Sequence, residues 1–274
     1  MNIVQAVILG IVQGLTEFIP VSSTAHLILV QRLMGWRFGA NVDFAFNVLI
    51  QLGTTVAVVL YFWKDLWSIA RAALTGIAQR APFAVDEARL GWFVVLASLP
   101  SFLIGLLFKQ YFAVLHEQAV FVAVVLIVAS ALLFGSEWLG KRARALPALT
   151  WLDALAIGFA QAVALIPGVS RSGATISGAL FCHIDRPAAA RFSFLMSVPV
   201  LVGASTLALR DLLAVPDFGA LLPPLLAGFV SAMLVGFASI HWLMSYLARR
   251  PLNAFGWYRI AAGILFLLVI FLRV

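Results

Sequence analysis

Six apolar stretches, each long enough to cross a bilayer, constrain the fold of this chain more than any other feature. The hydrocarbon core is roughly 30 Å thick, which a helix of about 20 apolar residues spans. Lipid offers no partner for a free backbone N–H or C=O, so a spanning segment folds as a helix. The stretches lie at about residues 41–63, 89–109, 118–138, 188–209, 221–246 and 256–273. The sequence therefore predicts an all-α polytopic membrane protein that forms a single membrane domain over residues 1–274.

Composition excludes other classes of protein. Of the 274 residues, 64% are hydrophobic and 11% are charged, which is not the composition of a soluble globular domain. The formal net charge of +7 is therefore explained by loop topology, and no nucleic-acid partner is expected. Cys182 is the single cysteine, so an intramolecular disulfide cannot form.

Residues 151–182 form a further apolar segment, interrupted in the middle by the sequence IPGVSRSGAT. Pro167 and Gly168 break the helix, because proline has no N–H and clashes with the preceding turn. Ser170 is suited to cap a new helix that begins near Arg171. Each arm is too short to span the hydrocarbon core, so the segment predicts a re-entrant helical hairpin.

Arg171 would lie at the tip of this hairpin, and arginine inside a membrane marks a functional site by default. An alternative is that Arg171 reaches the interface or caps a carbonyl group. Hydroxyl groups accompany the guanidinium beside a helix N-terminus, a position that favours anions, and phosphate is the natural ligand. These hydroxyls belong to Ser170, Ser172 and Thr175.

Residues 2–35 repeat the pattern and predict a second hairpin. Glu17 is its single carboxylate, Pro20 breaks the helix, and hydroxyl groups follow the break before His26. These hydroxyls, which we expect to cap the second arm or to hold phosphate, belong to Ser22, Ser23 and Thr24.

Gln13 and Glu17 are four positions apart and share one helix face. A buried carboxylate needs a cation, a metal ion or a proton. Carboxylate and amide oxygens together with phosphate oxygens suit Mg²⁺ or Ca²⁺, and a protonated glutamate bonded to a neighbouring helix is the alternative. Ser23 lies one turn before His26, which could accept the serine proton.

An internal repeat relates the two halves. Gln13 and Gln161 lie 148 positions apart, as do the motifs FAF at 44–46 and FSF at 192–194. Each half, about 1–145 and about 146–274, therefore contains one hairpin and three spans. An odd number of spans inverts the second half, so we expect an inverted-topology repeat whose hairpin tips meet near the midplane.

Basic residues set the orientation. On this topology twelve of them fall on one side, which we therefore place in the cytoplasm, and five on the other. Both termini would then be periplasmic, and we expect the site to open to the periplasm. The twelve are Lys64, Arg71, Arg80, Arg89, Lys141, Arg142, Arg144, Arg186, Arg191, Arg249, Arg250 and Arg259; the five are Arg32, Arg37, Lys109, Arg210 and Arg273.

These motifs resemble a known family along essentially the whole chain. QGLTEF at 13–18 matches an (E/Q)xxxE element, IPVSSTAHL follows it, and PGVSRSGAT at 167–175 matches a PGxSRSxxT element. The chain is similar to undecaprenyl-diphosphatases of the bacitracin-resistance (BacA/UppP) type. It departs from them in having Gln13 where several members carry glutamate, and Ala25 where glycine is common.

The resemblance implies a bacterial inner-membrane enzyme that hydrolyses undecaprenyl diphosphate to the monophosphate carrier and phosphate, in support of peptidoglycan synthesis. By position it implies an essential group of Glu17, Ser23, His26 and Arg171, with Gln13 and Glu17 serving a divalent metal. Ser170, Ser172 and Thr175 would hold phosphate.

Three questions stay open at the level of sequence. The nucleophile is Ser23 with His26 as its base, or His26 itself, or water activated by Glu17. A secondary transporter or lipid flippase with an anion site at the midplane is the alternative function, because the inverted repeat alone favours it. A second copy of the chain, forming a homodimer, is left open as a partner.

Overall fold

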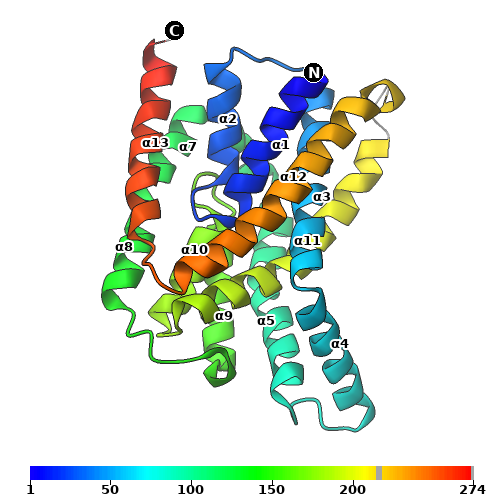
Figure 1. Ribbon diagram of the computed structural model, residues 1–274, viewed down its shortest axis with the longest axis vertical. Helices are drawn as coiled ribbons and strands as arrows, with labels where there is room; N and C mark the ends of the chain where they lie inside the picture. The colour runs from blue at the N-terminus through cyan, green and yellow to red at the C-terminus, as the bar shows by residue number, and fades with distance from the viewer. Residues whose placement is uncertain (214–217, 273–274) are drawn as a thin grey trace.

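The computed structural model describes residues 1–213 and 218–272, without the side chains of residues 209–211, 213 and 220. Arg273 and the side chain of Arg210, both counted above in the orientation of the chain, lie outside this description. The described residues form helices joined by short turns (Figure 1). The α-helices are α1 (Ile3–Phe18), α2 (Ser23–Leu33), α3 (Ala40–Tyr61), α4 (Trp63–Ala78), α5 (Asp86–Leu107), α6 (Lys109–Glu117), α7 (Ala119–Val128), α8 (Ser130–Leu139), α9 (Trp151–Val163), α10 (Arg171–Phe181), α11 (Arg186–Leu213), α12 (Phe218–Leu247) and α13 (Asn253–Leu272).

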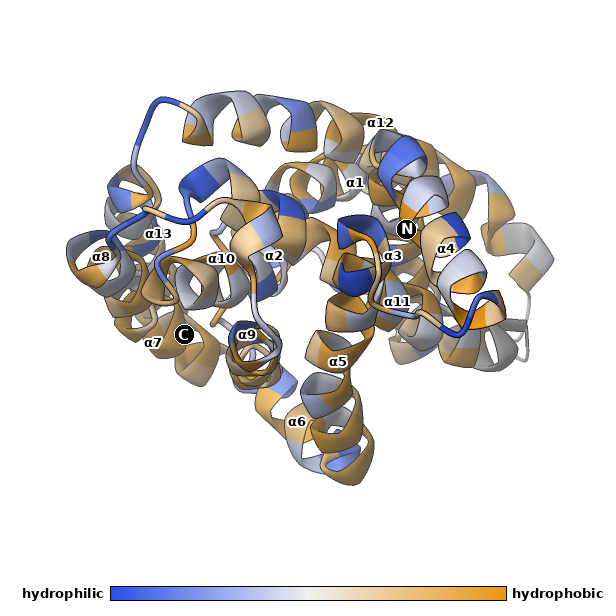
Figure 2. Ribbon diagram, turned by 90° about the horizontal axis from the view of Figure 1, so that it is seen from below, coloured by the Kyte–Doolittle hydropathy of each residue, from blue (hydrophilic) through white to orange (hydrophobic). Residues whose placement is uncertain are grey.

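Six helical segments of the described chain are long and apolar enough to cross a membrane, and they coincide with the six predicted stretches. They are α3, α5, the pair α7–α8, most of α11, most of α12, and α13. Many of their large hydrophobic side chains are exposed on the surface of the bundle. Hydrophobic residues dominate these helices, whereas hydrophilic residues lie in the connecting loops and on parts of α2, α3 and α4 (Figure 2). The predicted all-α, multi-pass membrane fold is confirmed.

The two interrupted segments form helical hairpins, α1–α2 and α9–α10, with breaks at the predicted places. The helix after each break begins beside a serine with a left-handed backbone, Ser22 at φ 72° and Ser170 at φ 73°. In Figure 1, α1 descends from the end where both termini lie and α9 rises from the opposite end. The division into repeats at about residue 145 stays a prediction.

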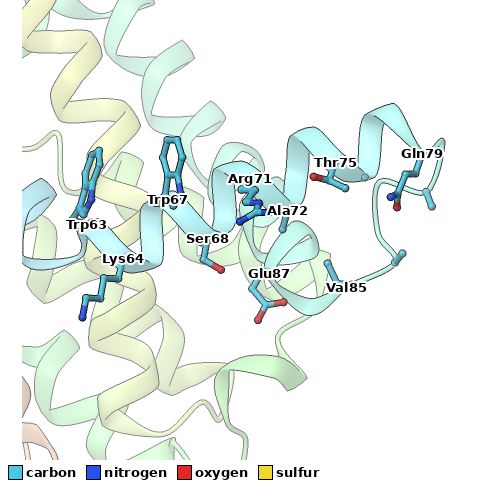
Figure 3. A pocket seen from close by; sticks show the side chains of 13 residues that line it. Trp63, Lys64, Trp67, Ser68, Arg71, Ala72, Thr75, Gln79, Val85 and Glu87 are labelled. Carbon is cyan, nitrogen blue, oxygen red and sulfur yellow. The ribbon is translucent and has the colours of Figure 1, made fainter.

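The amphipathic helix α4 lies between the first two spans, where no element was predicted from the sequence. Its residue Ile69 packs against α5, where a Cβ added at Gly91 would come within 2.8 Å of the Ile69 side chain. Trp63 and Trp67 stack on the opposite side, with ring centroids 6.1 Å apart, and extend in the same direction (Figure 3). A short helix bearing tryptophan and basic residues is typical of a membrane interface.

Close packing at small residues fixes the first hairpin inside the bundle. A Cβ added at Gly14 of α1 would lie 2.7 Å from the backbone nitrogen of Gly236 in α12. Phe18, at the end of α1, is fully buried and meets Phe194 of α11 edge-on, with ring centroids 5.6 Å apart. These contacts hold the first break of the chain deep between the spans.

Candidate active site

The tips of the two hairpins meet at an ion pair. Nη2 of Arg171, the first residue of α10, lies 2.9 Å from Oε1 of Glu17 in the last turn of α1. The two side chains are 14% and 8% exposed. A hydrogen bond also joins the two hairpins: the Ser172 hydroxyl donates to the carbonyl oxygen of Ile19 at 3.3 Å. The structure therefore brings the two predicted motifs together.

Ser23 pairs with Glu17 rather than with His26, which corrects the expected serine–histidine pair. The Ser23 hydroxyl donates to Oε2 of Glu17 at 2.7 Å. The left-handed backbone of Ser22 turns the chain just before Ser23, and the Ser22 side chain makes no capping hydrogen bond. The carboxylate therefore lies where it can accept the serine proton.

Both ring nitrogens of His26 have other partners. Nδ1 lies 2.8 Å from the carbonyl oxygen of Ser22, and because a carbonyl can only accept, Nδ1 carries the proton. In the neutral ring Nε2 then accepts a hydrogen bond from the Tyr258 hydroxyl at 2.9 Å. The two rings also stack, with centroids 5.5 Å apart and planes 6° apart. Tyr258 was not identified from the sequence, because no sequence motif indicates that α13 packs beside α2.

Two glutamines complete the surroundings of Glu17. Gln13 Nε2 donates to Glu17 Oε2 at 3.2 Å and to Gln51 Oε1 at 3.1 Å, while Gln51 Nε2 donates to Glu17 Oε1 at 3.3 Å. With Ser23 and Arg171, the carboxylate thus accepts four hydrogen bonds, which is how a buried charge is accommodated. Gln51 could have been recognised as an amide in the middle of an apolar span.

The hydroxyls of the second motif mainly hold the hairpin together. Ser170 caps α10 as predicted, since its Oγ accepts from the Gly173 N–H at 3.2 Å. Thr175 is fully buried, donates to the carbonyl oxygen of Arg171 at 2.8 Å, and lies 2.6 Å from the Ser193 hydroxyl of α11. Ser172 is also fully buried, and Thr24 in the first hairpin is half-buried. The expected phosphate contacts of Thr175 and Ser172 thus compete with bonds inside the fold.

A second arginine lies beside the N-terminus of α10. Arg259 of α13 is fully buried; its Nε donates to Leu126 O at 3.2 Å and its Nη2 to Gly168 O at 3.0 Å. Its Nη1 would lie 3.1 Å from a Cβ placed on Gly173. Nη1 of Arg259 and Nη1 of Arg171 are both buried without a hydrogen-bond partner among the residues that the structure describes.

This position of Arg259 corrects its assignment to the cytoplasmic loops and leaves eleven basic residues on that side. Arg171 begins α10 and Arg259 lies beside Gly173 in the same turn, while Glu17 is paired with Arg171 alone among the described residues. This region therefore has excess positive charge. A buried cation without a counter-charge is costly. The site is therefore suited to an anionic ligand.

The oxygen atoms near Glu17 are the candidate ligands for a divalent metal ion. Among the described residues, no three or more His, Cys, Asp or Glu side chains are grouped so that they could hold a metal ion by themselves. Glu17 supplies one carboxylate, and the side-chain oxygen Oε1 of Gln13 accepts no hydrogen bond from the described residues. Mg²⁺ is commonly held by one or two carboxylates plus substrate phosphates. The donor set thus fits such an ion when a phosphorylated ligand completes it.

The fold and the site define a polytopic membrane protein with a buried, positively charged site between two hairpins. The family model described as Bacitracin resistance protein BacA matches residues 6–265 of the chain. The chain belongs to this family.

Several relatives are similar over nearly their whole length. A protein named undecaprenyl-diphosphatase from Chlorobium phaeobacteroides (strain BS1) is 42% identical, over 96% of this chain and 95% of the relative. Proteins of the same name from Mycobacterium sp. (strain KMS), at 40% identity, and Thermomicrobium roseum, at 42%, each cover 98% of this chain. The alignments cover 97% and 99% of these two relatives.

Proposed function

We propose that this chain is an undecaprenyl-diphosphatase, which hydrolyses undecaprenyl diphosphate to undecaprenyl phosphate and inorganic phosphate. This reaction recycles the lipid carrier of peptidoglycan synthesis and accounts for bacitracin resistance. The observation that carries the proposal is the Ser23 hydroxyl, bonded at 2.7 Å to a carboxylate that is itself paired with Arg171 across the two hairpins. A nucleophile, a base and a phosphate-binding cation thus meet at one point. The names of the relatives support the same reaction.

In the mechanism that this geometry favours, Ser23 Oγ attacks the terminal phosphorus while its proton passes to Glu17. The new Oγ–P bond replaces the bond to the bridging oxygen, and undecaprenyl phosphate leaves with the proton from Glu17. Water then attacks the phosphoserine, gives a proton to Glu17, and releases inorganic phosphate as Ser23 Oγ regains a proton. The free Nη1 groups of Arg171 and Arg259 are suited to stabilise the charge on the phosphoryl oxygens.

A divalent cation, Mg²⁺ or Ca²⁺, is proposed as the cofactor. Gln13 and Glu17 would hold it together with the phosphate groups of the substrate. It would supply charge neutralisation at the transferring phosphoryl group.

We propose that the protein is located in the bacterial inner membrane and that its site opens to the periplasm. The excess of basic residues in the loops at the α4–α5, α8–α9 and α12–α13 ends supports this orientation. The homodimer stays a prediction, to be checked by measuring particle mass in lipid nanodiscs.

Phosphate release from a C15 or C55 prenyl diphosphate by the purified protein tests the proposal. We expect hydrolysis by the wild type and a loss of about 10²–10³ in rate for Arg171→Lys, which keeps the charge but loses the planar fork. Ser23→Ala should abolish turnover and still bind the lipid. Ser68→Ala and Arg249→Lys, outside the site, serve as matched controls. Full hydrolysis by Ser23→Ala would show that the nucleophile is water or His26 instead of Ser23. If the wild type bound the lipid without hydrolysing it, the transporter would be favoured.

A further inference from the structure

A groove of about 310 Å³ lies between α3 and α11. The lining residues of α3 lie 3, 4 and 7 positions after Phe44 and so share one face of the helix. The lining residues of α11 have small side chains. The small side chains leave the room that the groove occupies. It is lined by Phe44, Asn47, Val48, Gln51, Ala204, Ser205 and Ala208.

Gln51 connects this groove to the site. The same side chain that lines the groove donates to Glu17 Oε1 at 3.3 Å and accepts from Gln13 at 3.1 Å. At Gln51 the groove is therefore one side chain away from the Glu17–Arg171 ion pair.

The α11 wall is open to the outside. Ala204 is exposed, and a Cβ added at the neighbouring Gly203 would meet no atom within 4 Å. Phe44, on the α3 side, is 38% exposed. Ser205 lies deeper, 6% exposed, and its hydroxyl has no hydrogen-bond partner among the described residues. The groove is thus open on the outer surface of two spans, and its lining residue Gln51 contacts Glu17 of the site.

Three other hollows of the described chain lack this connection. The hollow beside α4, of about 480 Å³, is lined by Trp63, Lys64, Trp67 and Arg71 among others and contains no residue bonded to Glu17 (Figure 3). The same holds for the hollow between α2 and the end of α13, and for the one at the end of α12.

We propose that the α3–α11 groove receives the first isoprene units of the lipid substrate, which enters sideways from the bilayer with its diphosphate against Glu17 and Arg171. This inference rests on the proposed function and adds the route and the tail-binding residues. The occupant follows from the lining, which is mainly apolar and includes the amide of Gln51, itself bonded to Glu17. A prenyl diphosphate has the same order of apolar tail and polar head. A volume of about 300–1,000 Å³ is typical of small-molecule sites, and the groove lies at the lower bound, as expected for the first part of a long chain.

Narrowing the groove from its open side tests the proposal. Ala204→Trp should raise the KM for a C15 prenyl diphosphate by about tenfold. The indole ring would fill the groove, so the isoprene units of the substrate could no longer be buried there. Ala204→Leu should have a smaller effect in the same direction. Val202→Trp, on the exposed surface of α11 outside the groove, is the matched control and should leave the KM unchanged. The inhibition constant of inorganic diphosphate, which has no tail, should be equal in all four proteins. An unchanged KM in Ala204→Trp, or a parallel rise in the inhibition constant, would overturn the assignment.

Photolabelling separates this inference from the proposed reaction. A prenyl diphosphate with a benzophenone on its first isoprene unit should label peptides 44–51 and 204–208, whether or not the protein hydrolyses it. Labelling confined to α2 and α13, or to α4, would reject the groove. Labelling of the groove by a wild type that releases no phosphate would reject the phosphatase and leave the lipid route in place.

Discussion

Glu17 and Arg171 form a 2.9 Å ion pair although 154 positions separate them along the chain. Neither charge can be accommodated alone at this depth, and removing one partner of a buried pair typically costs about 3–5 kcal/mol. The pair is therefore both a structural lock between the hairpins and the centre of the proposed chemistry.

Glu17→Gln should lower kcat by about 10²–10³ or more, because it removes both the proton acceptor of Ser23 and the single carboxylate offered to a metal ion. Gln13→Glu should lower the metal concentration needed for half-maximal activity. Gln118→Glu, at an exposed position before α7, adds the same charge as a control. Phosphate release measured across a magnesium titration checks both results, and full activity in excess EDTA would remove the metal from the mechanism.

Tyr258→Phe should lower kcat/KM by about 2- to 10-fold, because it removes one hydrogen bond to His26 while keeping the ring stack. The matched control is Tyr111→Phe, whose ring is 62% exposed. The activity of both variants as a function of pH is the measurement. A Tyr258→Phe profile that superimposes on the wild type would show that the contact does not position His26.

Arg259→Lys should lose most activity, because one ammonium group cannot serve Leu126, Gly168 and a phosphate at once. The decisive measurement is the inhibition constant of inorganic phosphate, which should rise by about tenfold or more for one lost charged contact. A purely structural role would lower thermal stability and leave phosphate inhibition unchanged in the folded fraction.

Cys182 should react slowly with maleimides. It lies in the turn after α10, where burial, followed by the charge and hydrogen bond of Asp153, raises the pKa of its thiol from 9.0 to about 11. Raising a thiol pKa lowers the thiolate fraction at neutral pH, here by about 100-fold, and reactivity should climb as the pH approaches 11. Alkylation rates at pH 7 and pH 9, with the SDS-unfolded protein as control, check this. Equal rates in the folded and unfolded protein would contradict it.

Gly14→Ala should lower stability by about 1–3 kcal/mol, because its methyl group would lie 2.7 Å from the backbone of Gly236. Gly203→Ala is the control, since a methyl group there meets no atom within 4 Å. Thermal unfolding in detergent compares the two. A Gly14→Ala protein as stable as Gly203→Ala would mean that α1 and α12 can move apart without cost.

Local chemistry explains why so much of the fold could be predicted. Hydrophobic length marks the spans, and Pro167 and the cap at Ser170 fix the start of α10 at Arg171. The meeting of the tips followed from the repeat. What could not be predicted depends on side-chain contacts between distant helices, such as the pairing of Ser23 with Glu17 instead of His26.

Arg259 shows the same limit. In sequence it reads as one more basic residue near a membrane edge, and only the packing of α13 against α7 and the second hairpin places it inside. Helix α4 was overlooked for a different reason: with Lys64, Asp65 and Arg71 it is too polar to count among the spans, and its amphipathic period was not examined between them.

The distance along the chain between Glu17 and its counter-charge also sets an order of events during synthesis. A ribosome adding about 5–20 residues per second makes the 154 residues between them in roughly 8–30 s. Throughout that interval the first hairpin has neither Arg171 nor the packing surface of α12 that receives Gly14. The first hairpin can therefore reach its final packing only after helices that are synthesised later. The part of the protein that is made first is among the last to adopt its native contacts.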